Sequence, residues 1–277
     1  MKPPLRVVDP HQGELVLGGR NQIKIGAEES GGAFSFWLGT TPRGKGPPLH
    51  VHQREDETFY ILEGEFEIVL AERTVRSGPG TCVFFPRHRP HTFRSAGPGA
   101  ASRALLLATP GDGMVSYFRA VGDADSETGE GMDLRQRVGT GYGLSFPGAG
   151  AALPPANGAR PFLYAPSRAR TAPLPGEAAI VPRLTSERSG GVVMEEVWSG
   201  AGAEWSPAPR GGPGVAYVAE GDHEVHLNGD RRRVGPGSTV FLPAGQRWSW
   251  AARGPGVGRV LCYAAPAAAD AKLAPRP

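Results

Sequence analysis

The sequence predicts an all-β protein in which one supersecondary unit occurs twice. Shifting the chain by 157 positions superimposes residues 58–95 on residues 215–252 without a gap and with twelve identities, which indicates an internal repeat. The contents of Gly (41) and Pro (28) are high for a helical protein but natural for short strands joined by turns. The 277 residues also allow two domains of roughly 100–150 residues each.

Each expected strand is short, rich in β-branched or aromatic residues, and bounded by Gly, Pro or charged turns. In the first half we expect strands at residues 21–26, 32–39, 57–71, 81–85, 91–95 and 101–109. In the second half we expect them at residues 191–198, 215–228, 238–242, 247–251 and 258–264. Between the halves, Gly, Pro and Ala are frequent and periodicity is weak, apart from a short helix near residues 116–121 or 132–138.

Four residues in a short window carry the chemistry: His50, His52, Glu57 and His91. Residues two apart in a strand point to the same face, so the first two histidines can bind one ion together. Glu57 follows a short polar turn at residues 53–56, and His91 must come from another strand. Three imidazoles and a carboxylate suit a first-row divalent metal with open coordination positions, and the lack of a thiolate argues against structural zinc.

These residues stand in the frame Gly44-x5-His50-Val51-His52-x4-Glu57-x6-Gly64, followed by Gly80-x5-Pro86-x4-His91. The frame resembles the two signature motifs of the cupin superfamily, the small antiparallel β-barrels. The second motif departs from the family at two positions that are not ligands: His88 stands where Gly is usual, and Ser95 where Asn is frequent. The resemblance implies two cupin (double-stranded β-helix, or jelly-roll) barrels in one chain, a bicupin.

The expected domains follow from the repeat and the resemblance. They are an N-terminal metal-binding barrel at residues 1–120, a Gly/Pro/Ala-rich crossover linker at 121–180, a C-terminal barrel at 181–265 and a flexible tail at 266–277.

The second copy of the motif has lost its ligands. The four ligand positions are occupied, at the offset of 157, by Pro207, Pro209, Gly214 and Trp248, none of which binds metal. His223 and His226 do not compensate, because residues three apart on a strand point to opposite faces. We interpret them as core or surface histidines and expect one divalent transition metal per chain, in the N-terminal barrel. We favour iron, although this donor set also fits Mn, Ni, Co and Zn.

The cavity above the metal should be apolar. Counting by twos from Glu57 and from His91 directs Phe59, Ile61 and Phe93 inward, and Phe36 is added from a neighbouring alternating run. These side chains indicate a flat or hydrophobic substrate. Glu57 can act as a general base or as a ligand only. His88 can donate a hydrogen bond to the site or act as an acid at its rim, and otherwise it is solvated.

Within the cupins, the chain resembles the quercetin 2,3-dioxygenase-like group over roughly residues 30–120. The segments that carry this resemblance are Gly31-Gly32-Ala33-Phe34, Phe59-Tyr60-Ile61-Leu62-Glu63-Gly64, Phe85 to Phe93 and Thr109-Pro110-Gly111. It implies a metal held by the three histidines and Glu57, deprotonation of a flavonol hydroxyl by Glu57, and cleavage by O2 with loss of carbon monoxide. Such sequences include proteins with other activities, so the exact substrate does not carry over.

Three functions are compatible with these observations. The first is a metal-dependent dioxygenase that acts on an enolic or phenolic aromatic compound. The second is a non-redox isomerase, cyclase or decarboxylase that uses the metal as Lewis acid and Glu57 as base. The third is a metal-dependent small-molecule binding protein without turnover. We expect a small-molecule substrate and O2 as partners.

Charge and composition restrict the other partners. The net charge of +3 is scattered, and the basic cluster at residues 231–233 lies beside an Asn-Gly turn without interleaved aromatic residues, so we expect no nucleic-acid partner. No apolar run approaches membrane-spanning length, and Cys82 and Cys262 form no metal or disulfide pattern. We expect a cytoplasmic monomer or homodimer that does not bind membranes.

Overall fold

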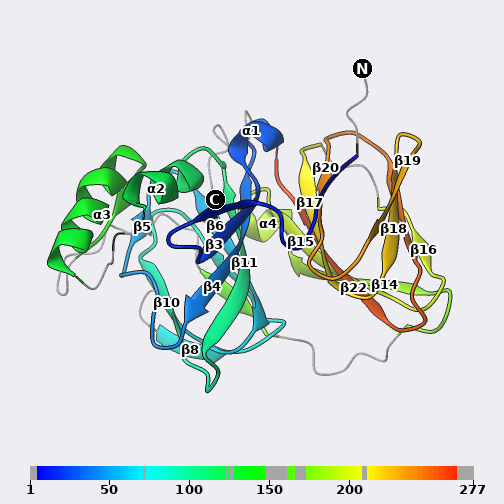
Figure 1. Cartoon of the computed structure of the whole chain (residues 1–277), viewed down its shortest axis with the longest axis horizontal. Helices are drawn as coiled ribbons and strands as arrows, with labels where there is room; N and C mark the ends of the chain where they lie inside the picture. The colour runs from blue at the N-terminus through cyan, green and yellow to red at the C-terminus, as the bar shows by residue number, and fades with distance from the viewer. Residues whose placement is uncertain are drawn as a thin grey trace. The chain divides into compact units, whose positions relative to one another are not determined.

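The computed structural model describes residues 5–70, 73–122, 124, 128–147, 161–165, 173–207 and 211–266. Its contacts divide the chain into two compact units. We call the unit built around Glu14–Pro166 the first barrel, and the unit that combines Met1–Gly13 with Ser167–Ala274 the second barrel. Each is built almost entirely of antiparallel strands (Figure 1). The predicted all-β class with two jelly-roll barrels is confirmed.

The first barrel has a seven-stranded sheet in the order β13-β9-β6-β11-β4-β3-β2, a three-stranded sheet β10-β7-β8 and a two-stranded sheet β12-β5. Its strands are β2 (Glu14–Val16), β3 (Asn21–Ile25), β4 (Ser35–Pro42), β5 (Val51–His52), β6 (Asp56–Glu63), β7 (Phe66–Leu70), β8 (Arg73–Ser77), β9 (Cys82–Phe85), β10 (His91–Ser95), β11 (Ala101–Thr109), β12 (Leu144–Ser145) and β13 (Phe162–Tyr164). Helices α1 (Ala27–Ser30), α2 (Met114–Val121) and α3 (Gly129–Gly141) complete it.

The second barrel has a six-stranded sheet in the order β1-β20-β17-β22-β15-β14 and a four-stranded sheet β16-β21-β18-β19. Its strands are β1 (Arg6–Val8), β14 (Ala178–Leu184), β15 (Val193–Ser199), β16 (Glu204–Trp205), β17 (Gly214–Glu220), β18 (His223–Leu227), β19 (Asp230–Val234), β20 (Thr239–Leu242), β21 (Trp248–Ala252) and β22 (Gly258–Ala264). Helix α4 (Ser186–Ser189) lies between β14 and β15.

The turns of the two barrels match in backbone conformation as well as in sequence. Gly64 and Gly221 both have φ of 75°, and each ends a long strand that the sequence had predicted to continue. The predicted strands 57–71 and 215–228 are therefore each two strands joined by a turn. His88 has φ of 65° and its counterpart, Gly245, has φ of 68°. The left-handed conformation explains why the cupin motif favours glycine at the His88 position.

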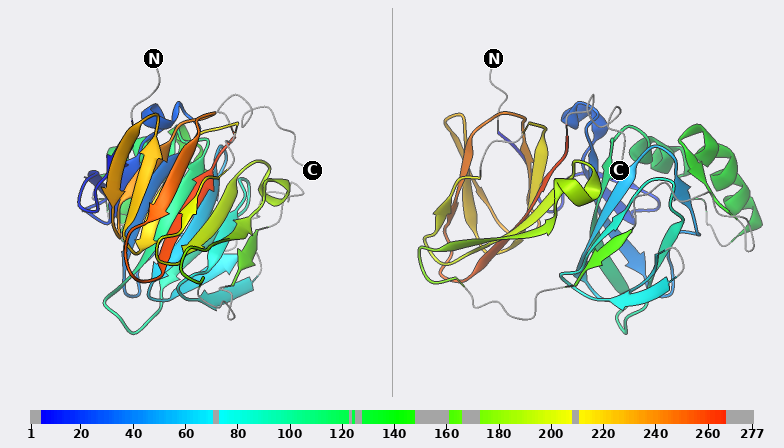
Figure 2. Two further views of the ribbon diagram at one scale, coloured as in Figure 1. Left: turned by 90° about the vertical axis from the view of Figure 1, so that its right-hand side faces the viewer. Right: turned by 180° about the vertical axis from the view of Figure 1, so that it is seen from behind.

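The edge strands of the two large sheets are exchanged between the repeats. Strand β1 pairs with β20 of the second barrel, and β13 pairs with β9 of the first. In Figure 1 the dark blue segment near the N-terminus lies beside β20, and in the rear view of Figure 2 a short green arrow lies within the cyan sheet. The expected N-terminal domain 1–120 is wrong at its start, because residues before Glu14 belong to the second barrel.

The expected crossover linker 121–180 is ordered where the structure describes it. Helix α3 packs against α2, β12 pairs with β5, and β13 extends the sheet of the first barrel. Both helices suggested by the sequence are present. Sequence patterning missed this arrangement because the two-residue and three-residue strands are too short to show alternation. The tail after Pro266 lies outside the described residues.

Each barrel has its own apolar core. In the first barrel the core combines inward-facing strand residues, such as Phe59, Ile61 and Phe66, with α2 residues such as Phe118. In the second it includes Val218, Val240 and Trp250. Both cysteines are buried and form no disulfide, as expected. Among the described residues, no helix is long and apolar enough to span a membrane.

Candidate metal centre

Three strands bring the four predicted ligands together. His50 immediately precedes β5, His52 ends it, Glu57 lies at the start of β6, and His91 begins β10. His50 and His91 are neighbours across an antiparallel bridge, with backbone N–H···O distances of 3.1 and 3.0 Å in the two directions. The sequence predicted that His91 comes from another strand, and this bridge is the contact that brings it to the other ligands.

The ligand atoms of these four buried side chains lie within 4.8 Å of one another. Nε2 of His50 is 3.1 Å from Nε2 of His52. Oε2 of Glu57 is 3.2 Å from Nε2 of His91 and 3.5 Å from Nε2 of His52. The quartet could therefore bind one metal ion. Among the described residues, no other group of three or more His, Cys, Asp or Glu side chains gathers in this way.

The outer ring nitrogens of His50 and His91 show which tautomer these two histidines adopt. Nδ1 of His50 is 2.9 Å from the carbonyl oxygen of Pro48, and Nδ1 of His91 is 2.9 Å from that of Arg89. A carbonyl can only accept, so both Nδ1 atoms carry the proton and both Nε2 atoms present lone pairs to the centre. Converging lone pairs and a carboxylate repel one another unless a cation lies between them, which is the chemistry of a metal site.

Burial and ring stacking support the same arrangement. Desolvation, followed by the effects of His91 and His52, holds the pKa of His50 well below its usual value, so the imidazole is neutral and able to ligate. The ring of His91 stacks on Phe85, with centroids 4.2 Å apart and planes 12° apart. The aromatic neighbour restricts rotation of the imidazole and keeps its lone pair directed at the centre.

Glu55 is a buried carboxylate beside the quartet that sequence analysis missed. Its side chain is fully buried, and its Oε2 lies 3.7 Å from Nδ1 of His52. Among the described residues, neither oxygen has a hydrogen-bond partner, and neither has the outer nitrogen of His52. Gly113 accommodates this carboxylate, because a Cβ there would lie 1.9 Å from Oε1. A carboxylate behind a ligating histidine orients the ring and increases its basicity.

The expected polar turn at residues 53–56 is one residue too long, because Asp56 begins β6. Asp56 is also buried, and it accepts hydrogen bonds from the backbone N–H and the guanidinium of Arg87 at 2.8 and 3.1 Å. Glu55 and Asp56 therefore both point into the protein. The run Glu55-Asp56-Glu57 was the available signal, since adjacent carboxylates seldom enter a core without partners.

His88 stands outside the quartet. Its Nδ1 lies 2.9 Å from Oε1 of Gln53, and its backbone N–H donates to the carbonyl oxygen of His52 at 2.7 Å. Desolvation, followed by the charge of Arg87, lowers its pKa. The residue therefore supports the backbone of a ligand, and its side chain is not among those that line the cavity.

A cavity of about 270 Å³ opens beside the quartet, with His50 and Glu57 in its wall. Phe59 and Phe93 line it as predicted, with ring centroids 4.6 Å apart. Ile61 and Phe36 do not line it. Ile61 packs deeper in the core, and β4 presents its opposite face, so Trp37 takes the place expected for Phe36.

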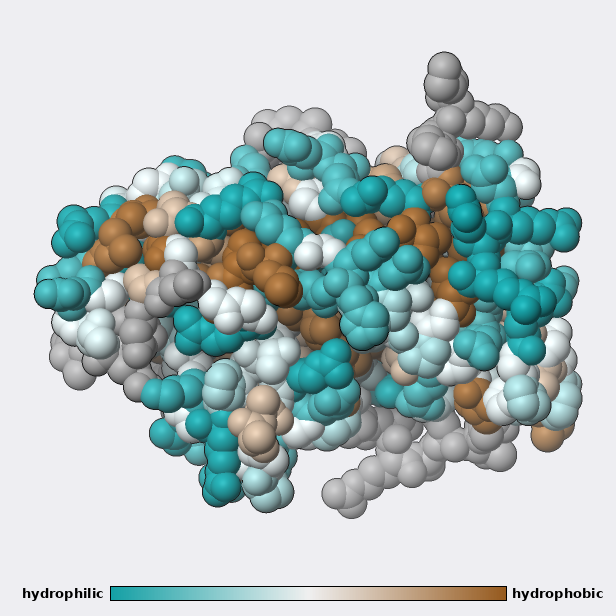
Figure 3. Space-filling view, viewed as in Figure 1, coloured by the Kyte–Doolittle hydropathy of each residue, from teal (hydrophilic) through white to brown (hydrophobic). Residues whose placement is uncertain are grey.

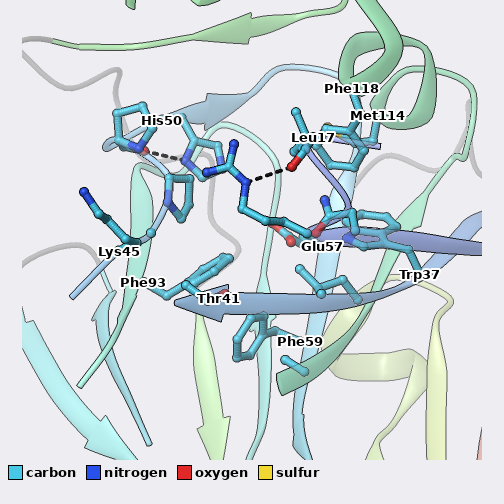
Figure 4. Close-up of a pocket in the computed structure, with 18 of the residues that line it drawn as sticks. Leu17, Trp37, Thr41, Lys45, His50, Glu57, Phe59, Phe93, Met114 and Phe118 are labelled. Carbon is cyan, nitrogen blue, oxygen red and sulfur yellow. Dashed lines mark hydrogen bonds between the residues drawn. The ribbon is translucent and has the colours of Figure 1, made fainter. Parts of the chain in front are cut away.

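Helix α2 forms the other side of the cavity. Figure 4 shows Met114 and Phe118 on one side and Phe59 and Phe93 on the opposite side, with Glu57 between them. In the space-filling view, apolar residues gather on the surface where α2 and α3 lie (Figure 3). Strand periodicity could not identify these wall residues, because they belong to a segment expected to end the barrel.

The corresponding region of the second barrel is filled by aromatic side chains. Trp205 stacks on Trp250 with centroids 6.0 Å apart, and both pack against the buried ring of His223. The pocket near Trp248 and Gly214 measures about 20 Å³. His226 is half-buried and pairs with Glu224. The two histidines face different surroundings, as expected, while Pro209 lies outside the described residues.

The fold and the site agree with known cupins. Residues 37–107 match the family model described as "Cupin domain", and this segment contains all four residues of the quartet. No curated protein matched the sequence. The matched segment and the two jelly-roll barrels support placement in the cupin superfamily.

Three solved structures illustrate the similarity. A putative glyoxylate-induced protein from Pseudomonas aeruginosa has a TM-score of 0.63 and 16% identity, covering 96% of this chain and 89% of that chain. An oxalate decarboxylase from Bacillus subtilis has a TM-score of 0.59 and 15% identity, covering 89% and 72%. A salicylate 1,2-dioxygenase from Pseudaminobacter salicylatoxidans has a TM-score of 0.56 and 15% identity, covering 84% and 71%. At these identities the likeness shows the fold alone.

Proposed function

We propose that this chain is a metal-dependent dioxygenase that acts on a phenolic or enolic aromatic small molecule. The observation that carries the proposal is the position of the quartet in the wall of a cavity lined by Phe59, Phe93 and Trp37. Four protein ligands leave two positions on a six-coordinate ion, enough for a substrate oxygen and O2. Aromatic walls suit a planar ring.

His50, His52, Glu57 and His91 would hold the metal, and the outer hydrogen bonds of His50 and His91 keep the Nε2 lone pairs of these two rings directed inward. A bound redox-active metal supplies Lewis acidity and electron transfer to O2. Glu57 Oε2 is the chain's proton acceptor at this site, taking the proton of a substrate hydroxyl and leaving an electron-rich phenolate or enolate. Phe59, Phe93 and α2 exclude water and orient the ring.

The metal itself is part of the proposal. Iron is our first expectation, and manganese is a serious alternative; the Bacillus subtilis oxalate decarboxylase, which has a similar fold, has Mn(II) centres. Elemental analysis of the purified protein, followed by O2 uptake with a panel of phenols and enols, tests both the metal and the reaction. Uptake that depends on substrate and on metal is expected. Anaerobic turnover would contradict the dioxygenase assignment.

Substitution of Glu57 tests its role as base. Glu57→Gln is expected to retain much of the metal while lowering kcat by about 10²–10⁴-fold, the usual contribution of a positioned base. The matched control is Glu63→Gln, on the same strand but exposed and paired with Arg103, which should leave O2 uptake unchanged. Activity that persists in Glu57→Gln would show that another group removes the proton.

A non-redox decarboxylase, isomerase or cyclase is the second candidate. It is favoured by the cationic side chains that share the cavity with Glu57, since they can stabilise an anion formed without O2. Turnover under argon, and activity with zinc in the site, would establish it. A protein that binds phenols tightly without any turnover, even after Glu57→Gln, would instead be a binding protein.

A further inference from the structure

The charges in the cavity wall are strongly unequal. Three cationic side chains line the cavity: Arg20, Lys45 and Arg135. Glu57 is the single carboxylate among the lining residues, and under the proposed function it belongs to the metal. A divalent ion adds further positive charge. A neutral substrate would leave this charge without compensation in a mostly apolar cavity, whereas an anionic substrate would neutralise part of it.

Arg135 and Lys45 are poor candidates for binding that anion. The guanidinium of Arg135 donates through Nε and Nη2 to the carbonyl oxygen of Ala124, at 3.2 and 2.7 Å. Its position therefore serves the connection between α2 and α3. Lys45 is exposed at the cavity rim, where solvent screens its charge.

Arg20 differs because its guanidinium is anchored at one atom only. Nε donates to the carbonyl oxygen of Leu17 at 2.8 Å, the contact drawn as a dashed line to Leu17 in Figure 4. Within the described residues, its terminal nitrogens form no hydrogen bond or ion pair that competes for a ligand. The side chain is half-buried. An anchored Nε with two available terminal N–H groups is the planar donor pair that binds a carboxylate through both oxygens.

The backbone turn that precedes Arg20 holds this residue in place. Leu17, Gly18 and Gly19 all have left-handed φ angles, of 54°, 63° and 77°. The carbonyl oxygen of Leu17 also accepts the backbone N–H of Arg20 at 3.3 Å, and the carbonyl oxygen of Arg20 accepts from Thr40 at 2.7 Å. A leucine in this conformation is strained, and such strain concentrates at functional sites. The turn fixes the arginine against β4, next to the cavity.

We propose that Arg20 binds a carboxylate on the substrate, so that the substrate class is small aromatic or enolic acids that also carry a hydroxyl for the metal. The hydroxyl part of this inference rests on the proposed function. The carboxylate part rests on Arg20 and does not require that function. The cavity of about 270 Å³ lies just below the range of about 300–1,000 Å³ typical of drug-sized ligands. A single-ring acid therefore fits better than a three-ring flavonol.

Calorimetric titration of the metal-loaded protein tests this proposal with three probes: salicylate, benzoate and salicylamide. Salicylate and salicylamide share the phenolic hydroxyl and differ in charge, whereas benzoate lacks the hydroxyl. Salicylate is expected to bind more tightly than salicylamide. Arg20→Met should weaken salicylate and benzoate by about tenfold to a hundredfold, the range for a charged hydrogen-bond pair, and leave salicylamide unchanged. Arg20→Lys should recover part of the loss.

Arg43→Met is the matched control, since Arg43 is exposed and does not line the cavity; it should change none of the affinities. Metal content and melting temperature should be equal in all variants. Equal binding of salicylate and salicylamide, or salicylate binding unaffected by Arg20→Met, would overturn the proposal. Charge-selective binding without O2 uptake would retain Arg20's role and reject the dioxygenase. O2 uptake with neutral phenols that is insensitive to Arg20→Met would support the dioxygenase and reject the role of Arg20.

Discussion

The two barrels are copies of one unit, yet among the described residues only the first has the requirements of a metal site. The first combines four inward-facing ligands with a cavity of about 270 Å³, and the second has a pocket of about 20 Å³ beside stacked tryptophans. Both keep the same left-handed turns, at Gly64 and Gly221 and at Gly80 and Gly237. Backbone turns therefore persist when the interior changes, because they specify the barrel and not its chemistry.

Gly214 shows how far the second barrel has diverged. It stands where the first barrel has Glu57, and a Cβ at this position would lie 2.4 Å from the carbonyl oxygen of Tyr263. Any carboxylate introduced there would first have to displace backbone. The two interiors therefore differ in the space available at this position as well as in the residue that occupies it.

Removal of one ligand should have the largest effect and should fall on the first barrel alone. His91→Ala is expected to reduce bound metal to background, because it removes a ligand and the ring stacked on Phe85. Trp248→Phe, at the equivalent position of the second barrel, should leave the metal content unchanged. Elemental analysis of both variants checks this, with circular dichroism as the test of folding. Metal retained in His91→Ala would mean that the quartet is not the site.

Glu55→Gln should have a smaller effect at the same centre. Loss of a carboxylate behind a ligating histidine lowers metal affinity by about 10–100-fold, and Glu55 Oε2 lies 3.7 Å from Nδ1 of His52. Competition with a chelator measures the change. The exposed Glu187→Gln is the control. An unchanged affinity would show that His52 is oriented by packing alone.

Deletion of residues 1–9 should destabilise the second barrel and spare the first, because β1 pairs with β20. Loss of the buried Val8 and partly buried Val7 should cost about 3 kcal/mol. Urea unfolding followed by tryptophan fluorescence is suitable, since Trp198, Trp205, Trp248 and Trp250 all lie in the second barrel.

The reciprocal change is Phe162→Ser on β13, which should weaken the first barrel, where Phe162 stacks on Phe84 at 5.3 Å. A deletion that lowered metal content while leaving tryptophan unfolding unchanged would contradict the strand exchange.

Acidification should have the smallest effect, again on the second barrel. Burial lowers the pKa of His223 to about 4, below its unfolded value of about 6.5. The unfolded chain therefore binds more protons between these values, and stability falls as the pH decreases through this window. From pH 7 to pH 5 the loss should be about 2 kcal/mol. In His223→Gln, the urea-unfolding midpoint should vary less with pH than in the unsubstituted protein. An equal pH dependence in both proteins would show that another group causes the effect.

Sequence patterning was most successful where a ligand fixed which face of a strand points inward. Phe59 and Phe93 follow a ligand by two residues and line the cavity as expected. The same reasoning failed for Phe36, because β4 is buried on both faces and alternation does not indicate which face meets the cavity. For Glu55 and Asp56 it indicated only a polar turn, because their partners, a histidine and an arginine, are brought to them by the fold.

By itself, the sequence determined the two-barrel architecture, the grouping of three histidines with Glu57, and the loss of these ligands from the second copy. All three follow from local spacing and from an internal repeat, which need no knowledge of distant contacts. Only the tertiary structure decided the exchanged edge strands, the wall supplied by α2, the carboxylate behind His52 and the position of Arg20. These depend on contacts between segments distant in the sequence, such as β1 with β20, or on turns without periodicity. In both cases chain packing, and not pattern, determines which side chains meet.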